Sequence, residues 1–378
     1  MAEAYMKAVD HLIEVCAIQK GENVLVLTEH EGRLRTDHFI AQLLAKKAME
    51  KGAHVSVMFT DTLPTGSAGE PSENVRQAIF SSDLSIILNH YAFLYNKTTY
   101  EAIFQYPTRI LNIIGSEANR ETLATPHIAG NMAVLQAIHQ YWREKLFGEK
   151  EVRMTSKRGT DFTCLTPPGG LWSGGTQRNK PVVKGAFRLG YWQGEGIIWP
   201  RETGNGVIYF DGFYGTGYSE DPIICHFKDG WCTKIESGGP RSKADKLKEV
   251  IAPFAGPPGA PHPYNMHCTE WALGINPTAR IYLKPDDEAL IEAQRNVGVC
   301  HVALGSRRVG NPPLGHAEFN CGIHVDGTIL DPTVTVDGEK LVEDGIAIYL
   351  NDPVLRERVR KLGEDPDIVL KQERKVIK

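Results

Sequence analysis

The sequence predicts an α/β fold in two parts: an N-terminal Rossmann-like domain over residues 1–147, and a larger α+β domain over residues 148–378. In the first part, short continuous apolar strands alternate with helices, which is typical of a parallel sheet covered on both faces. In the second part, Gly, Trp and Tyr accumulate and strand-like alternation replaces the apolar runs. The length of 378 residues also suits two domains.

Helices and short apolar strands alternate along the N-terminal part of the sequence. The first helix has one apolar side and is ended by Gly21. Thr36 is expected as the N-cap of the second helix, and Gly52 as the residue after its end. The expected elements are, in order, helix 2–18, strand 23–27, helix 36–51, strand 54–59, a helix opened by residues 71–74, strand 84–88, helix 97–105 and strand 109–114.

Strands and turns dominate the second part. Residues 151–166 (EVRMTSKRGTDFTCLT) alternate as a strand pair does, with Arg158-Gly159 as its turn. The other expected elements are a helix over 242–255, a short helix over 288–297, and a charged, amphipathic terminal helix from residue 352 that is followed by a loose tail.

Composition and charge exclude several classes of protein. A net charge of −4 provides no basic face for nucleic acid or for an anionic membrane. No stretch approaches the roughly 20 apolar residues of a membrane span, and Asp10, His11 and Glu14 interrupt the N-terminal apolar run, unlike a secretory leader. The seven cysteines are scattered, odd in number and lack C-x-x-C, which favours reduced thiols. We therefore expect a cytoplasmic protein without nucleic-acid or membrane partners.

Candidate metal ligands concentrate in the second part. On a strand, His324 and Asp326 would share one face about 7 Å apart, where an imidazole and a carboxylate form half of a divalent-metal site. An ordinary polar pair on an edge strand is the alternative. Glu195 and Glu270 each lie among aromatic and apolar residues, and a buried carboxylate must be paired, protonated or metal-bound. For each of these two, a solvent-facing strand edge is the alternative.

From residue 150 onward the sequence resembles the aminopeptidase T family of thermophilic metallo-aminopeptidases. In that family Glu, Glu, His, His and Asp bind two divalent cations, with one Glu bridging them. The resemblance implies a metal-dependent hydrolase that cleaves a peptide or a small amide with a metal-activated water. It also implies a homodimer and one or two Zn, Co or Mn ions per chain. The matching segments are Gly194-Glu195, EWALGINP (270–277), HVALGS (301–306), His324-Val-Asp326 and TVDGEKLVEDG (335–345), so the implied ligands are Glu195, Glu270, His301, His324 and Asp326.

The chain is also similar to the iron-dependent 2,5-dihydroxypyridine 5,6-dioxygenases of the same superfamily. In those enzymes two His and one carboxylate hold a single Fe(II), with open positions for substrate and O₂. This alternative implies Glu270, His324 and Asp326 around one Fe(II), with Glu270 where those enzymes have a His. Glu195 and His301 occupy positions that those enzymes have lost. The matching segments are Arg109-Ile-Leu, SKRGTDF (156–162), Trp199-Pro200 and His324-x-Asp326.

Because all five ligand positions carry the expected residues, the hydrolase is the main expectation and the Fe(II) dioxygenase the alternative. The aminopeptidases carry a Tyr seven residues after the first His, where this chain has Arg308. An arginine there would favour an anionic substrate, such as a small carboxylated or cyclic amide. Glu318 is a candidate general base, with an ordinary surface glutamate as the alternative, and His316 is a candidate structural or substrate-contacting histidine.

Overall fold

The computed structural model places most of the chain in two compact units, each described here by itself. Of the described residues, those up to 124 and residues 181–189 belong to unit 1, and the others belong to unit 2. The described residues are 2–30, 37–61, 70–89, 96–113, 119–124, 132–169, 181–189, 195–198, 200, 203–283, 290–306 and 321–377.

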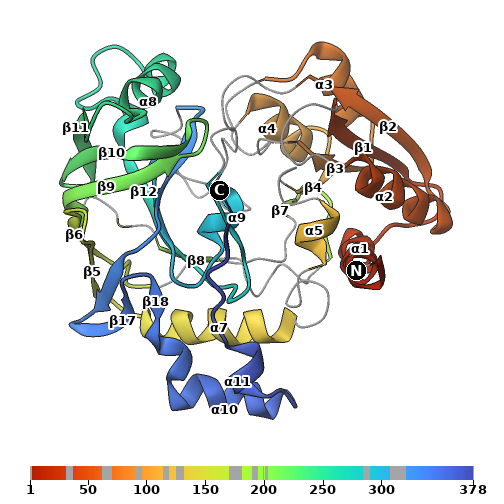
Figure 1. Cartoon of the computed structure of the whole chain (residues 1–378). Coiled ribbons are helices and arrows are strands. Elements are labelled where there is room, and N and C mark those ends of the chain that lie inside the picture. Colours follow the sequence, from red (N-terminus) through yellow and green to blue (C-terminus); the bar gives the residue numbers. More distant parts are fainter. Residues whose placement is uncertain are drawn as a thin grey trace. The chain divides into compact units, whose positions relative to one another are not determined.

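Unit 1 is built on a five-stranded parallel sheet with the strand order β2-β1-β3-β4-β7 (Figure 1). Every neighbouring pair in it is parallel, which confirms the predicted parallel sheet. The strands β3 and β4 are buried throughout, as expected for a parallel sheet that is covered on both faces. The strands are β1 (Asn23–Glu29), β2 (His54–Thr60), β3 (Leu84–Leu88), β4 (Arg109–Asn112) and β7 (Phe187–Leu189).

The helices of unit 1 begin close to where the sequence predicts them. The N-cap of α2 is Asp37, whose side chain accepts a hydrogen bond from the backbone N–H of Phe39. The predicted cap, Thr36, lies outside the described residues. Gly52 follows α2 with a φ of 85°, a conformation that glycine adopts without strain. The helices are α1 (Ala2–Cys16), α2 (His38–Glu50), α3 (Glu73–Phe80), α4 (Lys97–Phe104) and α5 (Arg120–Leu123).

Unit 2 contains one large antiparallel sheet that curls along its path (Figure 1). Its strands follow the order β18-β17-β16-β5-β6-β9-β15-β14-β12-β8, and β10 pairs with both β9 and β11. The predicted hairpin over 151–166 is confirmed as β5 and β6, with Gly159 in the turn at a φ of 117°. The strands are β5 (Glu151–Thr155), β6 (Asp161–Leu165), β8 (Glu195–Ile198), β9 (Asn205–Phe213), β10 (Gly217–Lys228), β11 (Trp231–Ser237), β12 (Cys268–Gly274), β14 (Cys300–Gly305), β15 (His324–Ile329), β16 (Thr333–Val336), β17 (Glu339–Glu343) and β18 (Ile346–Ala347).

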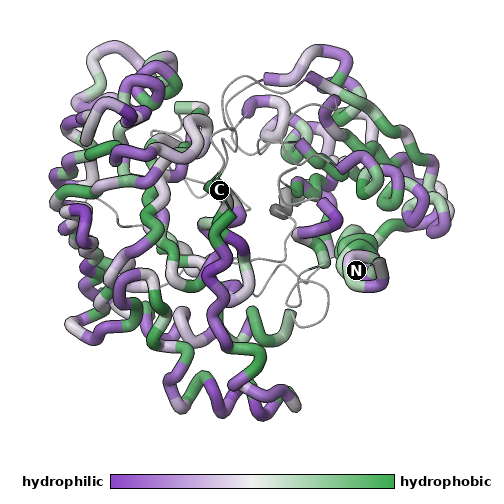
Figure 2. Tube along the Cα trace, viewed as in Figure 1, coloured by the Kyte–Doolittle hydropathy of each residue, from purple (hydrophilic) through white to green (hydrophobic). Residues whose placement is uncertain are grey.

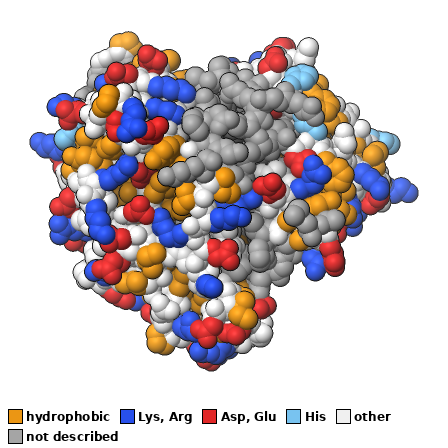
Figure 3. All heavy atoms as spheres, in the orientation of Figure 1, with side chains coloured by type: hydrophobic (Ala, Val, Ile, Leu, Met, Phe, Trp, Pro, Cys, Tyr) orange, Lys and Arg blue, Asp and Glu red, His pale blue; other side chains and the backbone are white. Residues whose placement is uncertain are grey.

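Five α-helices accompany this sheet among the described residues. Figure 2 shows hydrophilic residues dominating α10, of which Leu355 and Val359 are buried. On the face drawn in Figure 3, acidic and basic side chains are interspersed. Within the described part of the chain, no helix is long and apolar enough to cross a membrane. The helices are α7 (Met132–Lys145), α8 (Ala244–Ile251), α9 (Ile291–Gln294), α10 (Pro353–Lys361) and α11 (Pro366–Val369).

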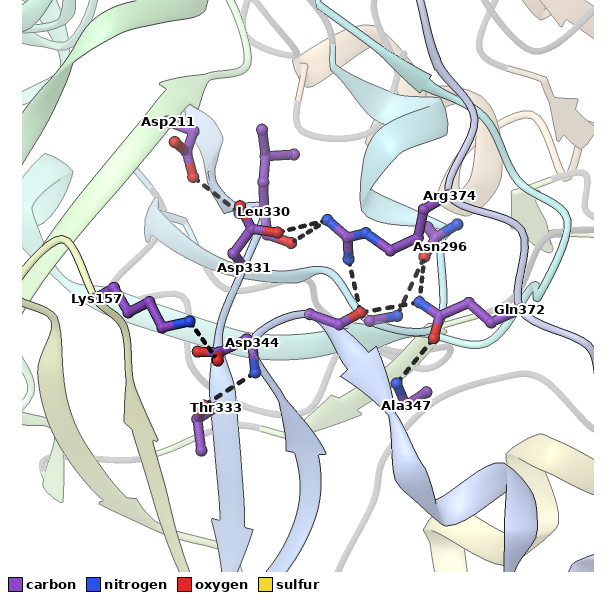
Figure 4. Close-up of polar contacts among 12 residues, drawn as sticks. Lys157, Asp211, Asn296, Leu330, Asp331, Thr333, Asp344, Ala347, Gln372 and Arg374 are labelled. Atoms are coloured by element: carbon purple, nitrogen blue, oxygen red, sulfur yellow. Dashed lines mark hydrogen bonds and ion pairs between the residues drawn. The ribbon is translucent and has the colours of Figure 1, made fainter.

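The C-terminal segment is fastened to unit 2, so the prediction of a loose tail is wrong. Its last strand, β19 (Val376–Ile377), pairs in parallel with β13 (Ile281–Tyr282). Gln372 donates to Asn296 Oδ1 at 3.1 Å and accepts from the backbone N–H of Ala347 at 2.9 Å (Figure 4). These partners lie far away in the sequence, and a local amphipathic pattern therefore does not reveal them.

Replacing Arg374 by alanine is expected to lower the free energy of unfolding by about 1–2 kcal/mol. Arg374 donates to the backbone carbonyls of Gly345 and Leu330 at 2.6 and 3.1 Å. Its ion pair with Asp331 adds little, because the carboxylate is 69% exposed. Urea denaturation would measure the change, with Lys371→Ala as the control because that residue is exposed on the same segment. If the two variants had equal unfolding free energies, the hydrogen bonds of Arg374 would not stabilise the attachment of the C-terminal segment.

Asp211 is a buried carboxylate with a pH-dependent effect on stability. Burial raises its pKa to about 6, although the backbone N–H of Leu330 and the guanidinium of Arg158 lower it. Since an unfolded Asp titrates near 3.9, the folded state binds more protons between pH about 4 and 6. The contribution of Asp211 to the unfolding free energy therefore falls as pH rises through this window, by up to about 3 kcal/mol.

The Asp211→Asn variant tests this expectation, because asparagine does not titrate. Urea denaturation at pH 4.5 and pH 7 should show the variant gaining stability relative to the natural protein at the higher pH. A stability difference that is equal at both pH values would contradict the raised pKa.

Candidate metal centre

Four of the predicted ligands lie on one face of three neighbouring strands, β12, β14 and β15. In the antiparallel register, Ala303 of β14 pairs with Glu270 on one side and with Asp326 on the other. His301 lies two residues before Ala303 and therefore shares its face, as His324 shares the face of Asp326. A β-bulge between Cys268 and Glu270 interrupts the register of β12 next to this group, and bulges often re-aim a side chain at a functional site.

The four side chains pair with one another in a nearly dry environment. His301 Nε2 lies 3.0 Å from Glu270 Oε1. His324 Nε2 lies 3.0 Å from Asp326 Oδ1 and 3.7 Å from Glu270 Oε2. The most exposed of the four, Asp326, has only 15% of its side-chain surface accessible. The register thus brings two imidazoles and two carboxylates from separate parts of the sequence into one cluster.

Electrostatics couple His324 to Asp326. Burial alone would lower the pKa of His324, but the carboxylates of Asp326 and Glu270 outweigh it and raise that pKa to about 9. Burial raises the pKa of Asp326, but the positive charge of His324 outweighs it and lowers that pKa to about 2. The Nδ1–H of His324 donates to the carbonyl of Ser306 at 2.8 Å. This bond turns Nε2 toward the carboxylates, as a second hydrogen bond does for metal-bound histidines.

The donor set fits a divalent metal in chemistry. With metal–ligand bonds of about 2.1 Å, neighbouring ligand atoms lie about 3.0 Å apart in an octahedron and about 3.4 Å apart in a tetrahedron. The measured separations of 3.0–3.7 Å span these values. Asp326 Oδ1 is also buried without a well-aligned hydrogen bond.

As they stand, however, no three or more His, Cys, Asp or Glu side chains in the described residues are arranged to hold a metal ion. The four side chains of the cluster pair with one another instead. A bound metal would therefore have to replace these pairs.

Of the remaining predicted site residues, only the backbone of Glu195 is described. Glu195 begins β8, and its backbone pairs with Gly274, four residues beyond Glu270 and therefore about 13 Å along the strand. Arg308, His316 and Glu318 lie outside the described residues. The structure therefore brings together four of the five predicted ligands.

A wall of the cluster that the sequence analysis missed is formed by the end of α9. Gln294 donates from Nε2 to Thr328 Oγ1 at 3.0 Å, and Thr328 pairs with His301 across β14 and β15. The next residue, Arg295, is 6% exposed, and its charge contributes to the low pKa of Asp326. Gly274 carries the sequence signal for this wall, because a glycine inside a strand often marks the close approach of another backbone.

Comparison with known proteins identifies the family. The family model for 2,5-dihydroxypyridine 5,6-dioxygenase matches residues 4–348. The chain belongs to this family. It is therefore an enzyme of a dioxygenase family, and membership implies a bound metal.

Structural comparison agrees with this dioxygenase family at the level of the fold. A 2,5-dihydroxypyridine dioxygenase from Pseudomonas putida KT2440 matches with a TM-score of 0.61 and 17% identity, over 93% of this chain and 98% of that chain. An alanine–glyoxylate aminotransferase from Nostoc sp. matches with a TM-score of 0.20 and 15% identity, over 29% of this chain and 26% of that chain. No curated protein matches the sequence.

Membership of the dioxygenase family contradicts the main expectation from the sequence, a metal-dependent hydrolase of the aminopeptidase T type. That expectation was wrong, and so was the assignment to aminopeptidases and metalloproteases. It depended on the presence of all five donor residues, but a set of donors fixes neither the number of metals nor the reaction. The family supports the alternative, the dioxygenase, instead.

Proposed function

We propose that the protein is a non-haem Fe(II) dioxygenase that cleaves the ring of a dihydroxypyridine-like N-heteroaromatic substrate. The observation that carries this proposal is the dioxygenase family match over residues 4–348. The cluster on β12, β14 and β15 supports it, because imidazoles and carboxylates gathered on one face are the ligand types that hold Fe(II) in oxygenases.

His324, Asp326 and Glu270 would hold the metal. When bound, Fe(II) supplies coordination positions and one-electron chemistry for a chelating ring and O₂. The Ser306 carbonyl fixes the ring of His324 through Nδ1. His301 Nε2 donates to Glu270 Oε1 and thereby orients that carboxylate. Because these side chains are almost fully buried, bulk water has little access to them.

Metal analysis combined with oxygen uptake tests the proposal. The protein would be purified without chelator, reconstituted anaerobically with Fe(II), desalted and then exposed to O₂ and 2,5-dihydroxypyridine. We expect one iron per chain and O₂ consumption that matches the loss of substrate. A Zn-loaded sample of the same preparation is the control and should consume no O₂. An iron-loaded protein that leaves both O₂ and the pyridine unchanged would contradict the proposal.

A further inference from the structure

Gln294 carries a buried hydrogen-bond acceptor that no group among the described residues satisfies. The residue is 0% exposed and its Nε2 donates to Thr328 Oγ1, but Oε1 has no partner. A buried carbonyl oxygen without a hydrogen bond costs free energy, and buried polar atoms therefore normally have a partner. Such an orphaned acceptor next to a candidate active site points to a ligand that supplies the missing donor.

The position of this carboxamide relative to the metal-ligand cluster follows from the strand register. Thr328 pairs with His301, and it lies two residues beyond Asp326 on the same face of β15. The backbone of Arg295 packs against β12 at Gly274, where an added Cβ would lie 2.5 Å from Arg295 O. The end of α9 is therefore held against the sheet at Gly274 of β12 and at Thr328 of β15, and the hydrogen bond to Thr328 places the carboxamide beside His301.

We propose that Gln294 recognises the substrate by accepting a hydrogen bond at Oε1 from the ring N–H of the heteroaromatic substrate. This inference rests on the proposed function, and it names the ring nitrogen as the feature that the site selects. A 2-hydroxypyridine ring in its lactam form presents an N–H donor beside a carbonyl oxygen, and Gln294 offers the complementary acceptor. The guanidinium of Arg295, next in the chain, favours negative charge on the ring oxygens.

The test compares two substrates in two proteins. The substrates are 2,5-dihydroxypyridine and its N-methyl counterpart, 5-hydroxy-1-methyl-2-pyridone, which lacks the N–H. The iron-loaded natural protein should show a KM about tenfold or more lower for the N–H compound, since a site built for a donor rejects the analogue that lacks it. In Gln294→Leu, which keeps the bulk but removes the acceptor, this preference should disappear while kcat changes little.

Two further variants separate recognition from a structural role. Gln294→Glu keeps an acceptor oxygen and should preserve the N–H preference, which keeps the test valid if the leucine variant fails to fold. Gln140→Leu alters an exposed glutamine of α7 that bonds to Glu144, and it should leave both KM values unchanged.

Two outcomes would overturn the inference in different ways. If Gln294→Leu retains the full N–H preference, Oε1 does not contact the ring nitrogen, and only the inference fails. If the iron-loaded natural protein consumes no O₂ with either compound, the proposed function fails and the inference fails with it.

Discussion

Replacing His324 by alanine is expected to abolish iron retention and to lower ring cleavage by at least about a hundredfold. Its Nε2 lies within 3.7 Å of both Asp326 Oδ1 and Glu270 Oε2, so it occupies the middle of the cluster. Removing the imidazole leaves two buried carboxylates without the positive charge that balances them, which opposes their close approach. Iron per chain after anaerobic reconstitution and desalting would measure the first effect, and O₂ uptake would measure the second.

His226→Ala is the matched control, because it removes a histidine from the same unit at a distance from the cluster. His226 lies on β10, is 41% exposed and pairs with Glu236. This variant should retain its iron and its activity. Since His324→Ala also alters packing, His324→Gln should be measured in parallel as a neutral side chain of similar reach. Full iron content in both His324 variants would remove this residue from the metal site.

The parts of the fold that local pattern encodes could be predicted from the sequence. The mainly apolar cores of β3 and β4 suit strands that are covered on both faces, as in a parallel sheet between helices. The Arg158-Gly159 turn needs a positive φ, which glycine supplies. By contrast, β7 pairs with β4 across more than seventy residues, and β19 reaches β13 from the far end of the chain. The local hydrophobic periodicity of the sequence carries no information about such distant strand pairings.

The candidate site was predictable to a similar degree. Alternation on a strand places His324 and Asp326 on one face, and the structure agrees. The proximity of Glu270 to His301 depends on the register of β12 against β14, including a bulge, and the sequence analysis grouped them only through a resemblance. Gln294 was missed because its importance depends on where α9 ends against the sheet. The reaction itself was wrongly predicted, because one set of donors serves hydrolysis and oxygenation alike.

Gly274→Ala is expected to lower the free energy of unfolding by about 2–3 kcal/mol and to raise the KM for the substrate. The added Cβ would lie 2.5 Å from Arg295 O and closer still to Asn296 O. Both are backbone atoms, which cannot rotate away as a flexible side chain can. The end of α9 must therefore shift, and Gln294 shifts with it. Urea denaturation measures the first effect, and steady-state oxygen uptake measures the second.

Gly169→Ala is the matched control for Gly274→Ala, because a Cβ added at Gly169 meets nothing within 4 Å. That variant should match the natural protein in both stability and KM. If Gly274→Ala lowers the free energy of unfolding but leaves the KM unchanged, the end of α9 stabilises the fold but does not contact the substrate. If both properties change, the close packing of α9 on β12 links the stability of unit 2 to substrate binding. We expect the second result, because the strand that carries Glu270 also supports the wall that carries Gln294.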